Sequence, residues 1–192
     1  MNIGYDVDGV ICNFGKALSR FLKNEFGAEI DLNQVKEYCD FEKLVRSYGI
    51  NVIDSFVCSI GSLESEAYEG IETINKRYSQ GHKIYLITAR THKDSALKWL
   101  YKNNVMYSDI FFVTHEEKYK VIKDLGLYTY IDDKIETLFS ICDKRIPTIP
   151  VVRDHPWNRR PHRYLNIIRV NDLYGYDEFI EQVLEIYKLS ID

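Results

Sequence analysis

The sequence has few of the residue patterns that mark secreted, membrane-spanning or zinc-binding proteins. Its four cysteines, Cys12, Cys39, Cys58 and Cys142, are scattered and form no Cys-x-x-Cys pair. This spacing favours reduced thiols in a cytoplasmic protein over a disulfide framework or a zinc site. No apolar run approaches the roughly 20 residues of a membrane span, and the first residues lack the basic and apolar regions of a signal peptide. We therefore expect no membrane partner.

A surplus of positive charge is also missing. Lysine and arginine number 25 against 29 acidic residues, which gives a formal net charge of −4, so we expect no nucleic-acid polymer as a partner. Hydrophobic residues make up 45% and charged residues 28%, which is ordinary for a globular protein. A chain of 192 residues is long enough for one domain with a modest insertion.

What the sequence does contain is a pair of aspartates directly after its first apolar run. Asp6 and Asp8 follow residues 2–5, and Gly9 comes next. Alternate residues of a strand share a face, and a turn at Gly9 can bring both carboxylates together at the strand's carboxyl end. Neighbouring carboxylates repel each other unless a cation or a shared proton relieves them. The pair therefore predicts a Mg²⁺ site beside a nucleophile, although alone it also fits a plain strand-to-turn signal.

The carboxyl half of the chain alternates short apolar runs with amphipathic segments. We expect strands at 83–87, 109–113, 127–131, 149–152 and 165–170, and helices at 95–103, 118–125, 136–142 and 176–189. This alternation predicts an α/β fold in which helices cover both faces of a parallel sheet. Ligands bind beyond the carboxyl ends of the strands in such sheets. Three polar clusters fall at such ends: Asp6 with Asp8, Thr88, and Asp132 with Asp133.

One stretch interrupts this alternation. From about Gly15 to Gly70 the sequence contains no clear buried strand, and apolar residues recur at helical spacing near 17–26, 41–48 and 52–57. We expect a small helical cap at 15–70, inserted after the first strand, and an α/β core formed by 1–14 and 71–192. The expected cap carries the aromatic residues Tyr38, Phe41, Tyr48 and Phe56.

The order of these motifs resembles the haloacid dehalogenase (HAD) superfamily of phosphatases and phosphotransferases. Asp6-x-Asp8, Thr88, Lys118 and Asp132-Asp133 follow one another on the expected elements. The runs DVDGVICNF, ITAR, IDD and DHPWNR, together with the position of the insertion, are similar to the 5′(3′)-deoxyribonucleotidase family. The resemblance implies a Rossmann-like HAD core with a helical cap, Mg²⁺ as the cofactor and a small phosphate monoester, a nucleotide, as the substrate.

The resemblance also implies a catalytic role for each aspartate, and phosphate chemistry supplies the reasons. Asp6 is expected to be the nucleophile that forms an aspartyl-phosphate. Asp8 is expected to protonate the leaving oxygen and then to deprotonate the attacking water. Mg²⁺ is expected to bind Asp6, the backbone carbonyl of Asp8, and Asp132 or Asp133, and to neutralise charge on the phosphate.

Two further positions are expected to bind the phosphate. Thr88 would donate its hydroxyl, with N–H groups of the backbone near Ala89, and Lys118 would offset negative charge on the transferring group. Thr88 could instead cap the helix that follows it. Lys118 lies in a charged stretch, and its spacing to the later aspartates favours it over Lys120 and Lys123.

Several residues near the expected site have two interpretations. Phe14 could stack on a nucleotide base or anchor the cap to the sheet. Arg90 could approach the phosphate or pair with an acid on the cap, and we expect it to bind substrate. Trp157 is favoured as a loop anchor over a platform for a base. No role is assigned to His82, His92, His115 and His162, because they show no ligand spacing.

Taken together, the motifs and the resemblance that they carry imply a Mg²⁺-dependent, 5′-nucleotidase-like phosphoric monoester hydrolase. The expected substrate is a nucleoside or deoxyribonucleoside monophosphate. Two alternatives remain: the same chemistry on a sugar phosphate or another small phosphoester, and a phosphate-binding protein without turnover. The Asp6 and Asp8 pair argues against the last, because a binding protein needs no acid two residues from a nucleophile.

Overall fold

A single parallel sheet organises the chain in the computed structural model, which describes residues 1–37, 43–49, 51–58 and 60–189. Among these residues the strand order is β3-β2-β1-β4-β5-β6, and every neighbouring pair is parallel. The strands are β1 (Asn2–Tyr5), β2 (Lys83–Thr88), β3 (Asp109–Phe112), β4 (Thr129–Asp132), β5 (Ile149–Arg153) and β6 (Ile168–Val170). The strand order reverses between β1 and β4, because β2 and β3 lie on one side of β1 whereas β4, β5 and β6 lie on the other. Ligands bind at such a point in folds of this type.

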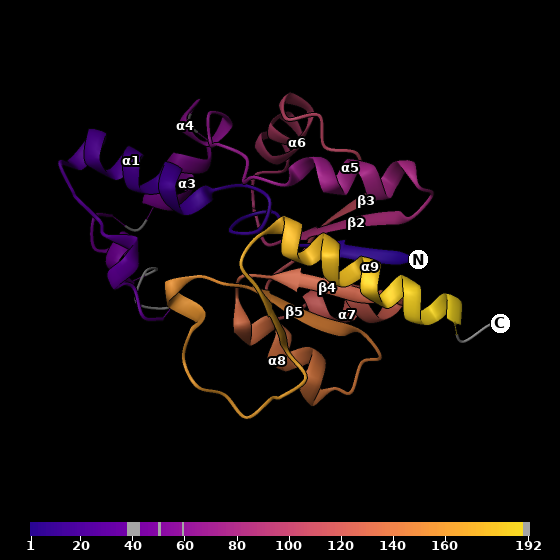
Figure 1. The fold of residues 1–192 in the computed structure, drawn as a ribbon. Helices are drawn as coiled ribbons and strands as arrows, with labels where there is room; N and C mark the ends of the chain where they lie inside the picture. The colour runs from indigo at the N-terminus through magenta and orange to yellow at the C-terminus, as the bar shows by residue number, and fades with distance from the viewer. Residues whose placement is uncertain (38–42, 50, 59, 190–192) are drawn as a thin grey trace.

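Helices cover both faces of the sheet, as the sequence predicts (Figure 1). One hydrophobic cluster joins the sheet to α5 (Ile71–Ser79), α6 (Lys93–Lys102) and α9 (Leu173–Leu189). A second cluster, on the other face, joins it to α7 (Lys118–Asp124) and α8 (Ile135–Asp143). Successive strand residues divide between the two clusters because strand side chains alternate. The pairs are Leu86 and Ile87, Tyr130 and Ile131, and Val151 and Val152.

Two expected starts in the carboxyl half of the chain differ from the structure by three residues. Of the strand expected at 165–170, only Ile168–Val170 forms a strand, β6. Leu165 is 99% exposed and lies in a loop outside the sheet. The last helix begins at Leu173 rather than 176. Its earlier start follows from Asp172, whose carboxylate accepts a hydrogen bond from the Gly175 N–H at 2.8 Å and so caps the first turn.

The helices that follow β1 have a hydrophobic cluster of their own. They are α1 (Phe14–Phe26), the short 3-10 helix η1 (Leu32–Gln34), α3 (Val52–Cys58) and α4 (Ile60–Leu63). Leu18, Leu22, Val45 and Phe56 are buried among them. In Figure 1, α1 and α3 lie beyond the end of the sheet at which the strands finish.

This arrangement supports our proposal of a cap at 15–70 and a core of 1–14 and 71–192. Residues 43–46 are helical, within the stretch near 41–48 whose spacing predicts a helix. Two of the expected cap aromatics, Tyr38 and Phe41, lie outside the described residues. Of the helices in the described residues, none is long and apolar enough to cross a membrane.

Candidate active site

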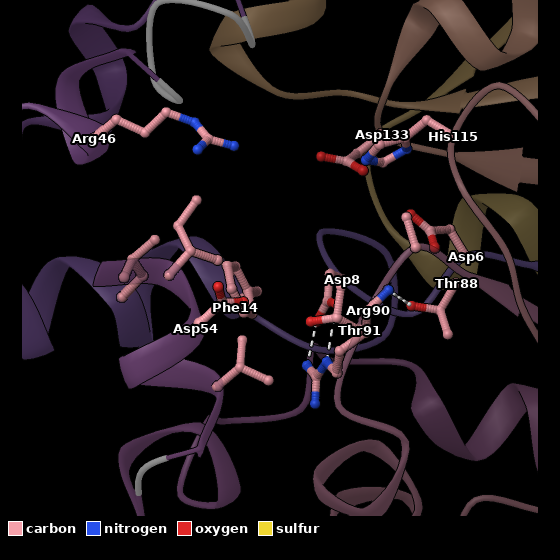
Figure 2. Close-up of a pocket in the computed structure, with 14 residues that line it drawn as sticks. Asp6, Asp8, Phe14, Arg46, Asp54, Thr88, Arg90, Thr91, His115 and Asp133 are labelled. Carbon is pink, nitrogen blue, oxygen red and sulfur yellow. Dashed lines mark hydrogen bonds and ion pairs between the residues drawn. The ribbon is translucent and has the colours of Figure 1, made fainter. Parts of the chain in front are cut away.

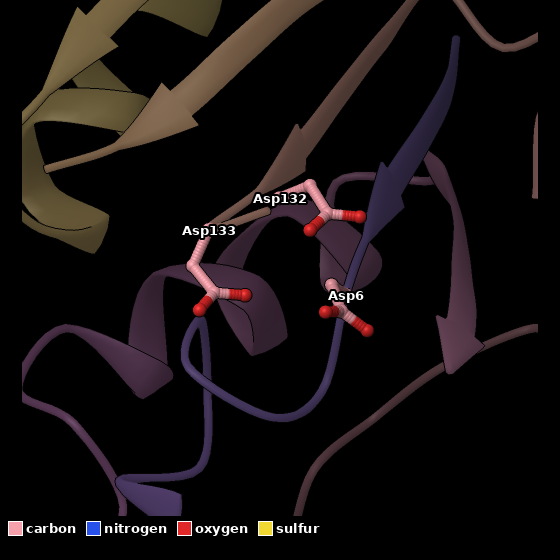
Figure 3. Close-up of side chains that lie close together, drawn as sticks. All are labelled: Asp6, Asp132 and Asp133. Atoms are coloured by element: carbon pink, nitrogen blue, oxygen red, sulfur yellow. The ribbon is translucent and has the colours of Figure 1, made fainter. Parts of the chain in front are cut away.

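Three aspartates converge where β1 and β4 end side by side (Figure 3). Asp6 follows β1, Asp132 is the last residue of β4, and Asp133 comes next. The two loops are aligned by the Asp6 N–H, which donates to the Ile131 carbonyl at 2.9 Å. One carboxylate oxygen from each aspartate lies within 4.8 Å of the other two, and all three side chains are buried. Aspartates that the sequence places at the ends of separate strands thus lie together in the structure.

Lys118, at the start of α7, places its ammonium between two of these aspartates. Its Nζ lies 3.0 Å from Asp6 Oδ1 and 2.9 Å from Asp132 Oδ2, and the side chain is fully buried. Asp132 is held further, because its Oδ2 accepts from the Tyr130 hydroxyl at 2.9 Å and its Oδ1 from the Lys134 N–H at 2.7 Å. The structure therefore brings Lys118, rather than Lys120 or Lys123, to the aspartates.

The cluster contains three acidic side chains and one basic side chain. Burial raises the pKa of Asp6 well above its usual range, although Lys118 opposes this rise. Burial, and then the neighbouring Asp132, raise the pKa of Asp133 to about 7. For Lys118 burial lowers the pKa, but Asp132 and Asp6 outweigh it and raise the pKa above its ordinary value. One ammonium faces three carboxylates, so a divalent cation would relieve the remaining repulsion.

Asp8 lies apart from this cluster, contrary to the expectation that its carboxylate meets that of Asp6. Its side chain forms a bidentate ion pair with Arg90, in which Nε donates to Asp8 Oδ2 at 3.0 Å and Nη2 pairs with Oδ1. Arg90 thus contacts Asp8, in the loop after β1, and not an acid on the expected cap. The guanidinium also lies 5.7 Å from the centre of the Phe14 ring.

Gly9 lets the loop after β1 pass directly over Asp133. Its φ is +82°, and a Cβ at this position would lie 2.4 Å from the Asp133 carboxyl carbon and from Oδ2. A residue with a side chain would have to adopt an unfavourable backbone conformation and would displace Asp133. The glycine after the Asp-x-Asp pair is therefore required by contact as well as by the turn.

Thr88 ends β2 beside the aspartates, with its side chain fully buried. Its Oγ1 accepts a hydrogen bond from the Arg90 N–H at 3.1 Å. The next helix, α6, begins after His92 instead, so the alternative of Thr88 as the cap of that helix is wrong. Thr88 and Ala89 both line the pocket described below, which leaves their phosphate role a prediction.

A pocket of about 280 Å³ lies between the carboxyl ends of the strands and the helices that follow β1 (Figure 2). From the α/β part it is lined by Asp6, Asp8, Thr88, Ala89, Arg90, Thr91, His115 and Asp133. From the helices it is lined by Phe14, Leu18, Arg46, Ile53, Asp54 and Val57. Phe14 also packs edge to face on Phe56, with ring centres 5.1 Å apart, so both interpretations of Phe14 have support.

Sequence reasoning missed three titratable residues that line the pocket, Arg46, Asp54 and His115. Figure 2 shows Arg46 reaching from the helical side toward the end of the pocket that holds Asp133, and Arg46 forms no ion pair with any other described residue. Asp54 lies on the same wall as Phe14. Burial, followed by Lys118 and Lys134, lowers the pKa of His115 to about 4, so it is a neutral ring. No spacing in the sequence distinguishes these residues from ordinary surface positions.

The comparisons with known proteins agree with this arrangement. No family profile matches the chain. It is 25% identical over 183 residues to an Oceanobacillus iheyensis protein named "Putative nucleotidase", across 90% of this chain and 96% of that one. Its structure is similar to a haloacid dehalogenase-like hydrolase of Streptococcus pneumoniae, with a TM-score of 0.63 and 13% identity across 93% of this chain and 97% of that one.

A third similar protein was solved with ligands. It is the D,D-heptose 1,7-bisphosphate phosphatase of B. bronchiseptica, in complex with magnesium and phosphate. The TM-score is 0.55 and the identity 12%, across 94% of this chain and 98% of that one. These likenesses confirm the HAD fold and the resemblance to nucleotidases that the motifs indicate.

We predict that Gly9→Ala destabilises the protein more than Gly27→Ala does. Gly27 also has a positive φ, +65°, but a Cβ there would meet nothing within 4 Å. The conformational penalty alone is about 1–2 kcal/mol, and Gly9→Ala adds the displacement of Asp133. Urea denaturation of both variants measures the free energies of unfolding. Equal losses would show that the loop after β1 does not press on Asp133.

Proposed function

We propose that the protein is a Mg²⁺-dependent phosphatase that hydrolyses nucleoside or deoxyribonucleoside monophosphates through an aspartyl-phosphate on Asp6. The observation that carries this proposal is the buried cluster of Asp6, Asp132 and Asp133 beside Lys118, in which Asp6 and Asp133 line a pocket at the carboxyl ends of the strands. The similarity to a protein named a nucleotidase supports the choice of substrate.

The donor set fits Mg²⁺. The cluster offers carboxylate oxygens, and among the described residues it includes no histidine or cysteine, which suits a hard cation over Zn²⁺. Both oxygens of Asp132 already accept hydrogen bonds. Asp6 and Asp133 line the pocket whereas Asp132 does not, so Asp6 and Asp133 would hold the ion, with the Asp8 carbonyl as a further oxygen. Bound Mg²⁺ supplies positive charge that offsets the charge of the phosphate and orients it for displacement.

Asp6 is placed to act as the nucleophile. Lys118 Nζ and the Val7 N–H, which donates at 2.8 Å, both engage Asp6 Oδ1, so Oδ2 is the oxygen left to react. Oδ2 forms a bond to phosphorus as the bond to the leaving oxygen breaks. Water then attacks the same phosphorus, the aspartyl bond breaks, and inorganic phosphate leaves with Asp6 regenerated. Thr88 would donate to a phosphate oxygen in both steps, and Lys118 would offset negative charge on the transferring group.

Asp8 moves the protons in both steps. As an acid it gives a proton to the leaving oxygen, and as a base it takes one from the attacking water. In the structure Arg90 pairs with its carboxylate at the wall of the pocket. Protonation of Asp8 weakens that pair, and the Arg90 guanidinium is then free to donate to a phosphate oxygen. The pair thus links the protonation of the acid to the binding of the phosphate.

The helical wall of the pocket supports a nucleotide as the substrate. Phe14, Leu18, Ile53 and Val57 offer an apolar surface for a flat base, whereas a sugar exposes hydroxyl groups that such a surface would leave without partners. Arg46 and Asp54, on the same wall, offer a donor and an acceptor for the edge of a base.

We predict that Asp6→Asn abolishes turnover and leaves the fold intact. Loss of a covalent nucleophile costs several orders of magnitude in rate, and the amide keeps the volume of the buried side chain. Hydrolysis of p-nitrophenyl phosphate measures the loss, with Asp124→Asn, an exposed position on α7, as the matched control. Asp6→Asn activity above a tenth of wild type, with deamidation excluded, would contradict the assignment of the nucleophile.

Removal of metal should stop the reaction reversibly. We expect EDTA to abolish phosphatase activity and added Mg²⁺ to restore it, because three buried carboxylates face one ammonium. Asp133→Asn should raise the Mg²⁺ concentration that gives half-maximal rate, since it removes a charged ligand. Full activity in excess chelator would rule out a metal-dependent mechanism.

Phe14→Leu should distinguish a base-binding ring from a core residue. Stacking of a base on an aromatic ring contributes about 1–3 kcal/mol, so kcat/KM for the preferred nucleoside monophosphate should fall about 5- to 150-fold. Turnover of p-nitrophenyl phosphate should change little. Phe56→Leu is the control, because Phe56 is fully buried against Phe14 and does not line the pocket. Equal losses on both substrates would favour the small-phosphoester alternative.

A further inference from the structure

We infer that Trp157 is a positioning residue that fixes the carboxylate of Asp133 for cation binding. It belongs to the segment Asp154–Asn158, here called the clamp, which follows β5 and includes the short 3-10 helix η2 (Pro156–Asn158). The inference rests on the proposed function, because it concerns the same cation site. It gives a role to the DHPWNR run, which has no part in the proposed reaction.

The clamp holds Asp133 at two points. The indole Nε1 of Trp157 donates to Asp133 Oδ2 at 3.1 Å, and Asn158 Nδ2 donates to the Asp133 backbone carbonyl at 2.8 Å. The first bond fixes the rotation of the carboxylate, and the second fixes the backbone that carries it. In Figure 3 the Asp133 carboxylate extends toward the same space as that of Asp6. A ligand carboxylate held by a second hydrogen-bonding group binds its ion in one orientation.

The clamp is itself rigid. The His155 ring stacks on Trp157, with ring centres 4.2 Å apart and planes 5° from parallel. Asn158 is fully buried, and its amide also donates to the Arg153 carbonyl at 2.7 Å. Its Oδ1 accepts from the His155 N–H at 3.1 Å and from Arg169 Nη1 at 2.7 Å. The side-chain amide is therefore saturated, which leaves Trp157 little freedom to move away from Asp133.

The end of β5 also holds the loop that follows Asp6. His155 Nε2 lies 2.8 Å from the Gly9 carbonyl, and the buried Arg153 donates from Nη1 to the Val10 carbonyl at 2.6 Å. The guanidinium of Arg153 lies over the ring of Tyr68, 3.2 Å from its centre. Both acidic loops are thus tied to one segment, which sets the position of Asp133 relative to Asp6.

The test compares the only two tryptophans of the chain. Trp157→Phe removes the N–H that bonds Asp133 and keeps a ring to stack on His155. Trp99→Phe is the matched control, because Trp99 Nε1 donates to the Ser65 carbonyl at 2.8 Å and does not line the pocket. Isothermal titration with Mg²⁺ measures affinity, and thermal unfolding without metal shows that each variant is folded.

We expect Trp157→Phe to raise the Mg²⁺ Kd about 10- to 100-fold, as loss of a bond to a metal ligand typically does. Saturating Mg²⁺ should restore kcat, and Trp157→His, which keeps a ring N–H, should recover part of the affinity. In Trp99→Phe, Trp157 is the sole indole, so its fluorescence should change as Mg²⁺ binds. If one variant fails to fold, Trp157→His or the wild-type fluorescence titration supplies the readout.

Two failures are distinguishable. Mg²⁺ affinity within twofold of wild type in Trp157→Phe, together with an indole signal that does not respond to Mg²⁺, would overturn the role of Trp157 and leave the proposed metal site intact. A wild-type protein without saturable Mg²⁺ binding would overturn the metal site and this inference with it.

Discussion

Three carboxylates buried together are unfavourable in any folded protein, and the position of Lys118 is what makes this arrangement possible. Its ammonium lies between Asp6 and Asp132 with no exposure to solvent. Loss of Lys118 would cost about 3–5 kcal/mol, because the carboxylates would stay buried without their cation, whereas loss of the Asp6 charge leaves Lys118 paired with Asp132. The ends of β1 and β4, and the start of α7, are therefore held to one another by electrostatics as well as by packing.

The charge that Lys118 leaves unbalanced accounts for the proposed chemistry. A site with surplus negative charge repels a phosphate ester, and the same surplus attracts a divalent cation, which then attracts the ester. The three aspartates differ in their hydrogen-bond partners. Both oxygens of Asp132 accept hydrogen bonds and support Lys118, Asp6 keeps one oxygen free for reaction, and Asp133 is held by Trp157. Similar residues thus acquire separate roles from their partners.

Sequence reasoning succeeded where a strand ends in a polar residue. The apolar runs before Asp6, Thr88 and Asp132 locate β1, β2 and β4, and parallel strands must bring their carboxyl ends to one edge. The pairing of Asp8 with Arg90 could not be predicted in this way, because the residues lie 82 positions apart and both were expected to face the substrate. The strand expected from Leu165 failed because an apolar residue in a loop has the same appearance in sequence as the start of a strand.

The residues that sequence reasoning missed share one property: their function depends on a neighbour that is distant in the chain. Arg46 is one of many charged residues in the insertion, and only the fold places it opposite Asp133. Trp157 was favoured as a loop anchor, yet nothing in the DHPWNR run indicates that its indole reaches an aspartate 24 positions away. Short sequence motifs therefore identify the aspartates of the proposed site, whereas the tertiary structure identifies the residues that lie against them, such as Trp157.

The most direct test of the account is to trap the covalent intermediate during turnover. The enzyme is mixed with Mg²⁺ and a phosphate monoester, quenched in acid, reduced with borohydride, and mapped by mass spectrometry after proteolysis. Borohydride reduces an aspartyl-phosphate to homoserine, so the account predicts homoserine at position 6 that depends on both substrate and metal. Homoserine at position 8, 132 or 133, or rapid turnover without any modified aspartate, would contradict Asp6 as the nucleophile.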